Sequence, residues 1–214
     1  MKDAISASYR DWLAEQEMPK GKRAAMLSAL ELFSKQGYDG TSTMAIAKNA
    51  GISQATIFKY FKTKDDLLAA IFKPMINNLL PEYREDFLAE IPQTATLREA
   101  IHFLVRDRYD FLIKNREVAL IFITQVMTNA ETRAMFQQFM ADTAPMFINA
   151  IYGTLKKSGS LRADLPPAAV LRTIAGQLLS YFVQRQVLMP EVKADEDIDL
   201  QLIEDLIVRA ISKD

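Results

Sequence analysis

The sequence predicts an all-α protein with a small N-terminal helical domain and a larger C-terminal helical domain. Apolar residues recur at helical spacing along the chain, and no segment shows a convincing strand alternation. The seven glycines and eight prolines fall mostly at expected helix boundaries. Two serines flank Gly51 at the spacing of a helix, a tight turn and a second helix. Together these observations predict an N-terminal helix-turn-helix domain.

The expected helices of the N-terminal domain lie before and after the turn at Gly51. Met26, Leu27, Leu30 and Phe33 mark the buried face of one helix, which Gly37 ends. Pro74 is expected to kink the last helix of the group, which ends near Pro81 or beyond it. The expected helices span Lys22–Gln36, Thr43–Ala50, Gln54–Phe61 and a longer segment from Lys64.

Five further helices are expected after a connection at Glu90–Thr96. The second of them is apolar on almost every side, which is typical of the centre of a bundle. The third is expected to bend at Pro145, and the fifth to bury Ile198, Leu202, Leu206 and neighbouring residues. The five span Leu97–Asn115, Arg116–Asn129, Glu131–Lys157, Pro166–Met189, with Asp164 or Leu165 near its cap, and Asp195 or Glu196 to Ser212.

Composition excludes several classes of protein. Half of the 214 residues are hydrophobic and a quarter are charged, which is the balance of a globular chain able to bury a core. No apolar run reaches the roughly 18 residues of a membrane span, and no apolar N-terminal segment suggests a secretory signal. The chain has no cysteine and one histidine, His102, which argues against disulfides, zinc sites and catalytic triads. We therefore expect a cytoplasmic protein that is not an enzyme and needs no metal or cofactor.

Charge is unevenly distributed. Residues 20–64 contain eight basic and two acidic side chains, a net charge of +6, whereas the remainder has 18 basic and 25 acidic side chains, a net charge of −7. The basic part is the one expected to meet a polyanion. Residues 1–19 are slightly acidic and carry Ile5, Tyr9 and Leu13 on one possible helix face, which favours a packed helix or a leader over a minor-groove arm. The expected domains are residues 1–19, 20–66 and 67–214.

The segment around Gly51 carries the chemistry of DNA recognition. Ser42 and Ser53 are placed to cap two short helices, and Gly51 can supply the positive φ of the turn between them. We expect Ile57, Phe58 and Phe61 to face inward, leaving polar side chains of the second helix to reach base edges or phosphates. Thr63 and Asp66 form a possible capping pair, with Lys64 at the positive end of the next helix.

These residues resemble those of the TetR family of bacterial transcriptional repressors. The resemblance covers Arg23–Phe72 and includes Gly37-Tyr38, the helix-turn-helix and the run from Tyr60 to Leu68. It implies an Ω-shaped dimer in which the last two long helices form a four-helix interface. Phe58 and Met44 depart from the family, which often has tyrosine and a polar residue there. The DNA-binding residues expected here are Ser42, Thr43, Lys48, Gln54, Ala55, Thr56, Lys59, Tyr60 and Lys64.

The remaining expectations concern regulation and assembly. The predicted function is a dimeric repressor, released from a palindromic double-stranded DNA operator by a small apolar or aromatic inducer. A regulator that answers to a protein partner or to its own concentration stays open as the alternative. Candidate ligand contacts are His102, Arg106, Tyr109, Gln125, Met127, Gln137, Met140 and Tyr181, most of which also suit ordinary core or surface roles. Candidate dimer contacts are Val170, Ile174, Leu178, Tyr181, Leu202 and Leu206.

Overall fold

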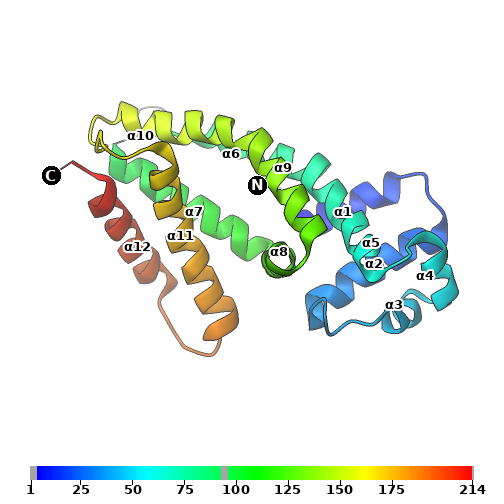
Figure 1. Ribbon diagram of the computed structural model, residues 1–214. Helices are drawn as coiled ribbons and strands as arrows, with labels where there is room; N and C mark the ends of the chain where they lie inside the picture. Colours follow the sequence, from blue (N-terminus) through cyan, green and yellow to red (C-terminus); the bar gives the residue numbers. More distant parts are fainter. Residues whose placement is uncertain (1–3, 93–95, 214) are drawn as a thin grey trace. The chain divides into compact units, whose positions relative to one another are not determined.

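The computed structural model describes residues 4–92 and 96–213, and it is built from helices (Figure 1). Within those ranges the one β-type contact is an isolated bridge between Leu161 and Ser212. The all-α prediction is therefore confirmed. Part of the expected connection before residue 97 lies outside the described residues. No helix in the described ranges is long and apolar enough to cross a membrane.

The chain divides into two compact units. The first comprises the chain up to Arg84 together with Asn115–Met140, and the second comprises Glu85–Lys114 and Ala141–Asp214. Because contacts alone define these units, the functional boundaries expected after residues 19 and 66 stay predictions. The helices of the first unit are α1 (Ile5–Glu15), α2 (Lys20–Gln36), α3 (Thr43–Ala50), α4 (Gln54–Tyr60), α5 (Lys64–Pro74), the π-helix η1 (Met75–Leu79), the start of α6 (Leu80–Glu90), α8 (Arg116–Thr128) and the start of α9 (Ala130–Phe147).

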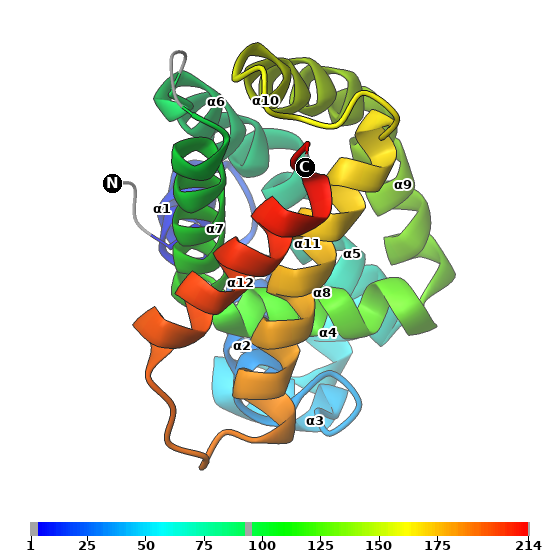
Figure 2. The same cartoon turned by 90° about the vertical axis from the view of Figure 1, so that its left-hand side faces the viewer.

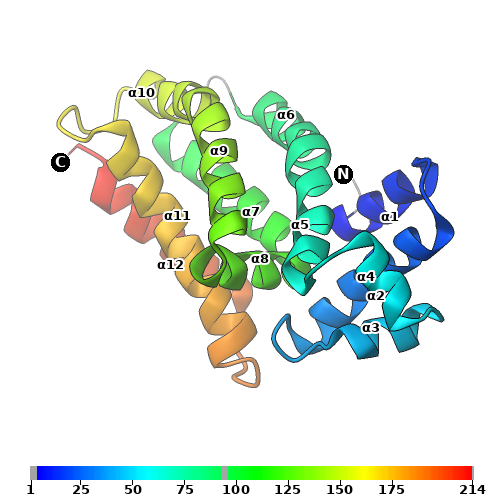
Figure 3. The same ribbon diagram turned by 45° about the vertical axis from the view of Figure 1, so that its right-hand side comes forward.

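Helix α2 is central to the first unit and contacts α3, α4, α5 and α8 (Figure 3). Its buried side chains include Ala25, Met26, Leu30 and Phe33, which recur at helical spacing. Gly37 follows the helix with a φ of 77°, a conformation that glycine adopts without steric cost. The helix predicted over residues 22–36 is thus confirmed, with a start two residues earlier.

Pro74 interrupts the regular α-helix as expected, and a π-helix follows it. Proline is the last residue of α5, and five residues of π-helix follow before α6 begins at Leu80. A proline ring crowds the carbonyl one turn earlier and offers no N–H, so the backbone widens locally instead of continuing its regular ladder. A π-helix also follows Pro145: α9 ends at Phe147 and is followed by η2 (Ile148–Tyr152) and α10 (Gly153–Lys157).

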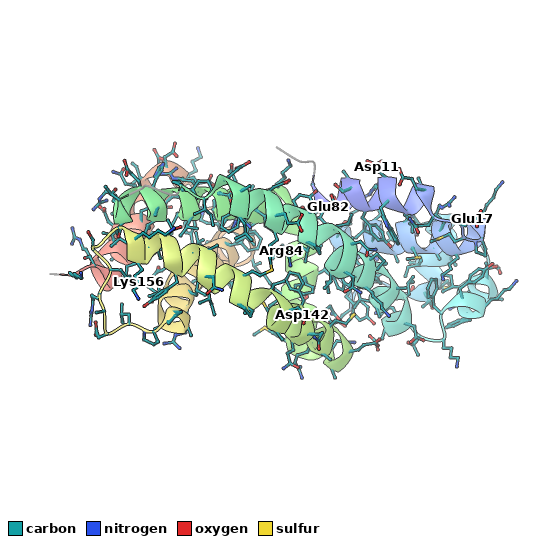
Figure 4. The ribbon with its side chains drawn as sticks, turned by 90° about the horizontal axis from the view of Figure 1, so that it is seen from above. Asp11, Glu17, Glu82, Arg84, Asp142 and Lys156 are labelled. Carbon is teal, nitrogen blue, oxygen red and sulfur yellow. The ribbon has the colours of Figure 1, made fainter. Side chains whose placement is uncertain are left out.

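The N-terminal segment forms a packed helix, α1, which was one of the two alternatives for it. Ile5, Tyr9 and Leu13 are buried on one face of the helix. The backbone N–H of Ile5 donates to Asn115 Oδ1 over 2.6 Å, and the Ser8 and Tyr83 hydroxyls lie 2.9 Å apart. The acidic side chains point to solvent, as Asp11 does in Figure 4.

The second unit is organised around α7 (Leu97–Lys114), α11 (Pro167–Val183) and α12 (Glu196–Ile211), which contact one another (Figure 2). A short π-helix, η3 (Gln184–Leu188), extends α11. Pro166 is the N-cap of α11 and provides no side-chain hydrogen bond, while Asp164 pairs with Arg162 instead of capping. Asp195 caps α12 by accepting from two backbone N–H groups of its first turn.

Two expectations about burial are wrong. Helix α8 was expected at the centre of a bundle, yet Val118, Ile121 and Gln125 are its buried residues and Met127 is 74% exposed. In α12, Ile198, Leu202 and Leu206 are exposed, because a single helix face is enough to cover α7 and α11. Side chains four residues apart on the opposite face therefore form an apolar stripe at the surface.

Candidate DNA-binding surface

The α3–turn–α4 segment has the geometry that its sequence predicts. Ser42 Oγ accepts from the Ala45 N–H and Ser53 Oγ from the Thr56 N–H, both over 3.1 Å. These two bonds satisfy helix N-terminal donors that would otherwise have no partner. Between the helices, Gly51 adopts the left-handed conformation, with φ 65° and ψ 31°. Local caps and one glycine thus define this turn.

The capping pair after α4 is also confirmed. The Thr63 hydroxyl accepts from the Asp66 N–H over 3.0 Å, and Asp66 Oδ2 accepts from the Thr63 N–H over 2.9 Å. This reciprocal pair fixes where α5 begins, immediately after α4. The short connection therefore holds the C-terminal end of α4 to the rest of the first unit.

The outer face of α4 consists of Gln54, Ala55, Phe58 and Lys59, all of which are exposed. The prediction that Phe58 faces inward is wrong, since its side chain is 48% exposed. Ile57 and Phe61 alone fill the inner face, because a helix of seven residues presents few positions to the core. Phe58 follows Gln54 by four residues, so the helical period already placed both on one side.

The start of α3 lies next to the start of α4. Gln54 Nε2 donates to Thr43 Oγ1 over 2.8 Å, so the two side chains form one polar pair at the surface. Ser42 and Lys48 are exposed on α3 and its cap, together with Met44, the residue that departs from the family pattern. These groups offer donors, an acceptor and an apolar contact to a duplex.

Thr56 and Tyr60 occupy a different side of α4 from the one predicted. Both side chains lie against the start of α2, where a Cβ built on Gly21 would stand 3.0 Å from Thr56 Cγ2 and 3.7 Å from Tyr60 Cε2. Thr56 Oγ1 is also 2.8 Å from Ser53 Oγ. Because Thr56 and Tyr60 lie between α4 and α2, they are less available to bases than Gln54 and Lys59.

Lys64 is committed largely to the protein. Its ammonium donates to the carbonyl oxygens of Tyr38 and Thr41 over 2.9 and 3.1 Å, and it lies 4.0 Å from the centre of the Tyr38 ring. Two of its three N–H donors therefore have partners within the chain, which leaves one for a phosphate, and the DNA contact expected of Lys64 stays a prediction. The ammonium holds the loop before α3 against the start of α5.

A hydrogen-bonded group beside Lys64 escaped the sequence analysis. The Tyr38 hydroxyl donates to Asp65, and Asn129 Nδ2 donates to Asp65 Oδ1 over 3.0 Å. Burial and the Asp65 bond raise the pKa of Tyr38 above its ordinary value. Partners 27 and 64 residues apart have no signal in a local pattern, so only the folded chain shows this group.

Four candidate ligand residues lie in the second unit. His102 Nδ1 and Arg106 Nε contact the two carboxylate oxygens of buried Glu204 on α12 over 2.9 and 2.8 Å, so both side chains link α7 to α12, and their role as ligand contacts stays a prediction. Tyr109 and Tyr181 are buried with ring centres 5.2 Å apart, and the Tyr181 hydroxyl donates to Asp199 Oδ2 over 2.9 Å. Burial raises the pKa of Tyr109 to about 12. These tyrosines are the pair of candidates that the structure brings together.

The other four candidates lie in the first unit. Gln125 is buried in α8, whereas Met127, Gln137 and Met140 are exposed at the end of α8 and along α9. Exposed side chains on separate turns do not by themselves form an enclosed site. Their assignment as ligand contacts stays a prediction.

The candidate dimer contacts divide between the inside and the outside of the chain. Val170, Ile174, Leu178 and Tyr181 are buried against the neighbouring helices, so the predicted α11 stripe is corrected to a core-facing one. The opposite face of α11 carries exposed Ala175, Gly176 and Leu179, and α12 carries exposed Leu202 and Leu206. A partner could reach those exposed side chains without any rearrangement of the fold.

Comparison with known proteins agrees with this geometry. Residues 26–71, which span α2 to α5, match the model of the bacterial regulatory proteins of the tetR family. The chain is 24% identical over 155 residues to the fatty acid metabolism regulator protein of Bacillus subtilis (strain 168), covering 71% of this chain and 76% of that protein. It is 36% identical over 93 residues to the HTH-type transcriptional regulator AcrR of Shigella flexneri, covering 42% and 43% of the two chains.

Solved structures extend the likeness of the fold to most of the chain. The transcriptional regulator FadR from Bacillus subtilis, in complex with stearoyl-CoA, superposes with a TM-score of 0.59 at 24% identity, covering 86% of this chain and 96% of that one. The relatives are transcription regulators, which confirms the prediction of a regulator rather than an enzyme. Residues 26–71, with their capped helix-turn-helix, therefore match the TetR family of bacterial regulatory proteins, and the all-helical fold of the chain is like that of a solved TetR-family regulator.

Proposed function

We propose that this regulator is a cytoplasmic, dimeric repressor that binds a palindromic operator and leaves it when a small apolar ligand binds. The observation that carries the DNA-binding part is the exposed face of α4, with Gln54, Phe58 and Lys59 beside Thr43 of α3. A two-fold dimer would place two such faces about 34–36 Å apart, one turn of the duplex. Phosphate contacts would come from the basic side chains of residues 20–64.

Dimerisation is supported by the outer face of α12. Ile198, Leu202 and Leu206 are spaced by four residues and are each 56% exposed. A contiguous apolar stripe on a helix surface is typical of a surface that is covered by a partner. A second copy of the chain, related by a two-fold axis, would bury the same stripe on both protomers.

The ligand class is supported by the relatives. The curated relative with 24% identity over most of both chains is a fatty acid metabolism regulator, and a structural neighbour carries stearoyl-CoA. A ligand of this kind would release DNA by binding better to a conformation in which the two α4 helices no longer match the operator.

The first experiment selects a duplex from a random pool with the wild-type protein and titrates binding with salt. If a dimer neutralises about eight phosphates, the slope of log K against log salt is roughly −7. Gln54→Ala should cost roughly 1–3 kcal/mol on the selected duplex and little on a scrambled one. Gln137→Ala removes an identical exposed side chain from α9 and should change neither. Salt-independent binding would contradict the DNA-binding assignment.

The second experiment adds stearoyl-CoA to the complex with the selected duplex, with choline as a second probe, since a structural neighbour was solved with choline. Release by stearoyl-CoA alone would support an apolar, acyl-type ligand. Release by choline alone would contradict the apolar class. If neither probe binds, control by a protein partner or by concentration becomes the better account.

A further inference from the structure

Helices α2 and α4 lie in contact with each other (Figure 3). Gly21, in the first turn of α2, lies next to Thr56 and Tyr60 of α4. A Cβ at this position would stand 3.0 Å from Thr56 Cγ2, although carbon atoms pack best at about 3.5–4.0 Å. Gly21 does not have a positive φ, so its backbone would accept any L-residue. The reason for glycine here is therefore space, even though alanine is the better helix former.

The Thr56 side chain cannot easily turn away from Gly21. Its Oγ1 is 2.8 Å from Ser53 Oγ, and Ser53 Oγ also accepts the Thr56 N–H as the N-cap of α4. Rotation about the Cα–Cβ bond would move the methyl group but would break the contact between the two hydroxyls. Because threonine is branched at Cβ, few other rotamers are open to it in a helix.

The start of α2 cannot easily withdraw either. The Arg23 guanidinium donates to the carbonyl oxygens of Leu13 and Gln16, over 3.1 and 2.5 Å, at the end of α1. Helix α1 is itself held at its first turn by the bond from the Ile5 N–H to Asn115 Oδ1. A methyl group added at residue 21 would therefore displace α4 more readily than α2.

We propose that Gly21 is a positioning residue for DNA recognition, which sets how α4 is seated on α2 and so how its outer face meets the duplex. Arg23 and α1 support it by fixing the start of α2, a role that accounts for the packed N-terminal helix. The proposal rests on the DNA-binding function proposed above. It is distinct from base contact, because Gly21 has no side chain with which to read a base.

The test measures affinity for the selected duplex and thermal stability in parallel. For Gly21→Ala we expect binding to weaken by on the order of tenfold, the size of one lost base contact, while Tm stays the same or rises because alanine favours helix. The matched control is Gly153→Ala, at the first residue of α10, where an added Cβ meets nothing within 4 Å. This control should leave affinity unchanged.

A second substitution separates positioning from direct obstruction. Thr56→Ser removes the Cγ2 methyl group and keeps the hydroxyl that contacts Ser53. In the Thr56→Ser background, Gly21→Ala should no longer weaken DNA binding, which appears as a large coupling in a double-mutant cycle. Amide NMR shifts of residues 54–60 should move in Gly21→Ala and return in the double variant.

Three results would overturn the proposal. These are wild-type affinity for Gly21→Ala, the same loss in the Thr56→Ser background, and a Tm that falls in step with affinity. The second result would show that a side chain at residue 21 blocks the duplex itself. If the wild-type protein selects no duplex, the proposed DNA-binding function is wrong. The amide shifts would then still show whether Gly21 determines the position of α4 on α2.

Discussion

The outer faces of α4 and α12 differ in chemistry, although each helix buries its other face in the same way. Helix α4 buries Ile57 and exposes Gln54, Ala55, Phe58 and Lys59. Helix α12 buries Leu200, Ile203, Ile207 and Ile211 and exposes Ile198, Leu202 and Leu206. A polar and cationic face suits a hydrated polyanion, whereas an apolar stripe suits another apolar surface. The two helices therefore indicate two partners of different kinds.

The two helices also differ in what holds them. Bonds between residues close in sequence fix α4, through Ser53, Gly51 and the Thr63–Asp66 pair. Long-range side-chain contacts hold α12, since Glu204 contacts His102 and Arg106, about 100 residues earlier in the chain. A local cap contributes about 1 kcal/mol, and a buried carboxylate left without its partners costs about 3 kcal/mol or more. Substitutions in the two regions should therefore act differently.

The largest expected effect separates the buried face of α11 from the exposed face of α12, which we propose forms the dimer. Leu178→Asp, at a side chain 4% exposed, should lower the free energy of unfolding by about 4 kcal/mol or prevent folding, because a charge enters the core. Leu206→Asp, at a side chain 56% exposed, should leave a folded monomer. Urea unfolding and sedimentation measure the two quantities. A wild-type protein that is monomeric at micromolar concentration would contradict the dimer.

The next effect compares neighbouring carboxylates on α12. Glu204→Ala should lower the free energy of unfolding by about 2 kcal/mol, since His102 and Arg106 lose their hydrogen bonds to a buried carboxylate, although Arg106 keeps its partner Asp197. Asp205→Ala removes a surface partner of Arg98 and should change the free energy of unfolding far less, because water screens an exposed ion pair. Denaturant unfolding at neutral pH gives both values. Equal losses would mean that burial does not distinguish the two pairs.

Two lysines near α4 sharpen the contrast between stability and DNA affinity. Lys64→Ala should lower the free energy of unfolding by about 1–2 kcal/mol, because the Tyr38 and Thr41 carbonyls lose their donor. Lys59→Ala should leave stability unchanged, cost roughly 1–3 kcal/mol on the selected duplex and relax its specificity. Melting curves and salt titrations of both variants decide this. A flatter salt slope for Lys64→Ala than for Lys59→Ala would support a phosphate contact by Lys64.

The smallest effect concerns Phe58, the exposed aromatic residue on α4. Phe58→Tyr should keep the fold and raise DNA affinity by the ~1 kcal/mol of one added hydrogen bond. The exposed ring leaves room for a hydroxyl, so no change in Tm is expected. Binding to the selected duplex and a melting curve are the measurements. A Tm lower by several degrees would show that the ring is packed after all.

Patterns within a few residues predicted the helix-turn-helix closely. The bounds of α3, its cap at Ser42, the turn at Gly51 and the Thr63–Asp66 pair all agree with the structure. Capping and turn formation depend on residues within about four positions of one another, so the sequence alone contains the information. The same holds for the start of α12 at Asp195.

The direction of each side chain on a helix depended on the rest of the fold. An apolar residue on α11 or α12 suits either the core or a partner, and only the packing of α7, α11 and α12 assigned Leu178 inward and Leu206 outward. Likewise, only the folded chain placed the Tyr38 and Thr41 carbonyls beside the Lys64 ammonium. The sequence by itself determined the turn at Gly51 and the caps of α3, α4, α5 and α12, because those signals are local. Tertiary structure decided which faces are covered, because that depends on residues far apart in the chain.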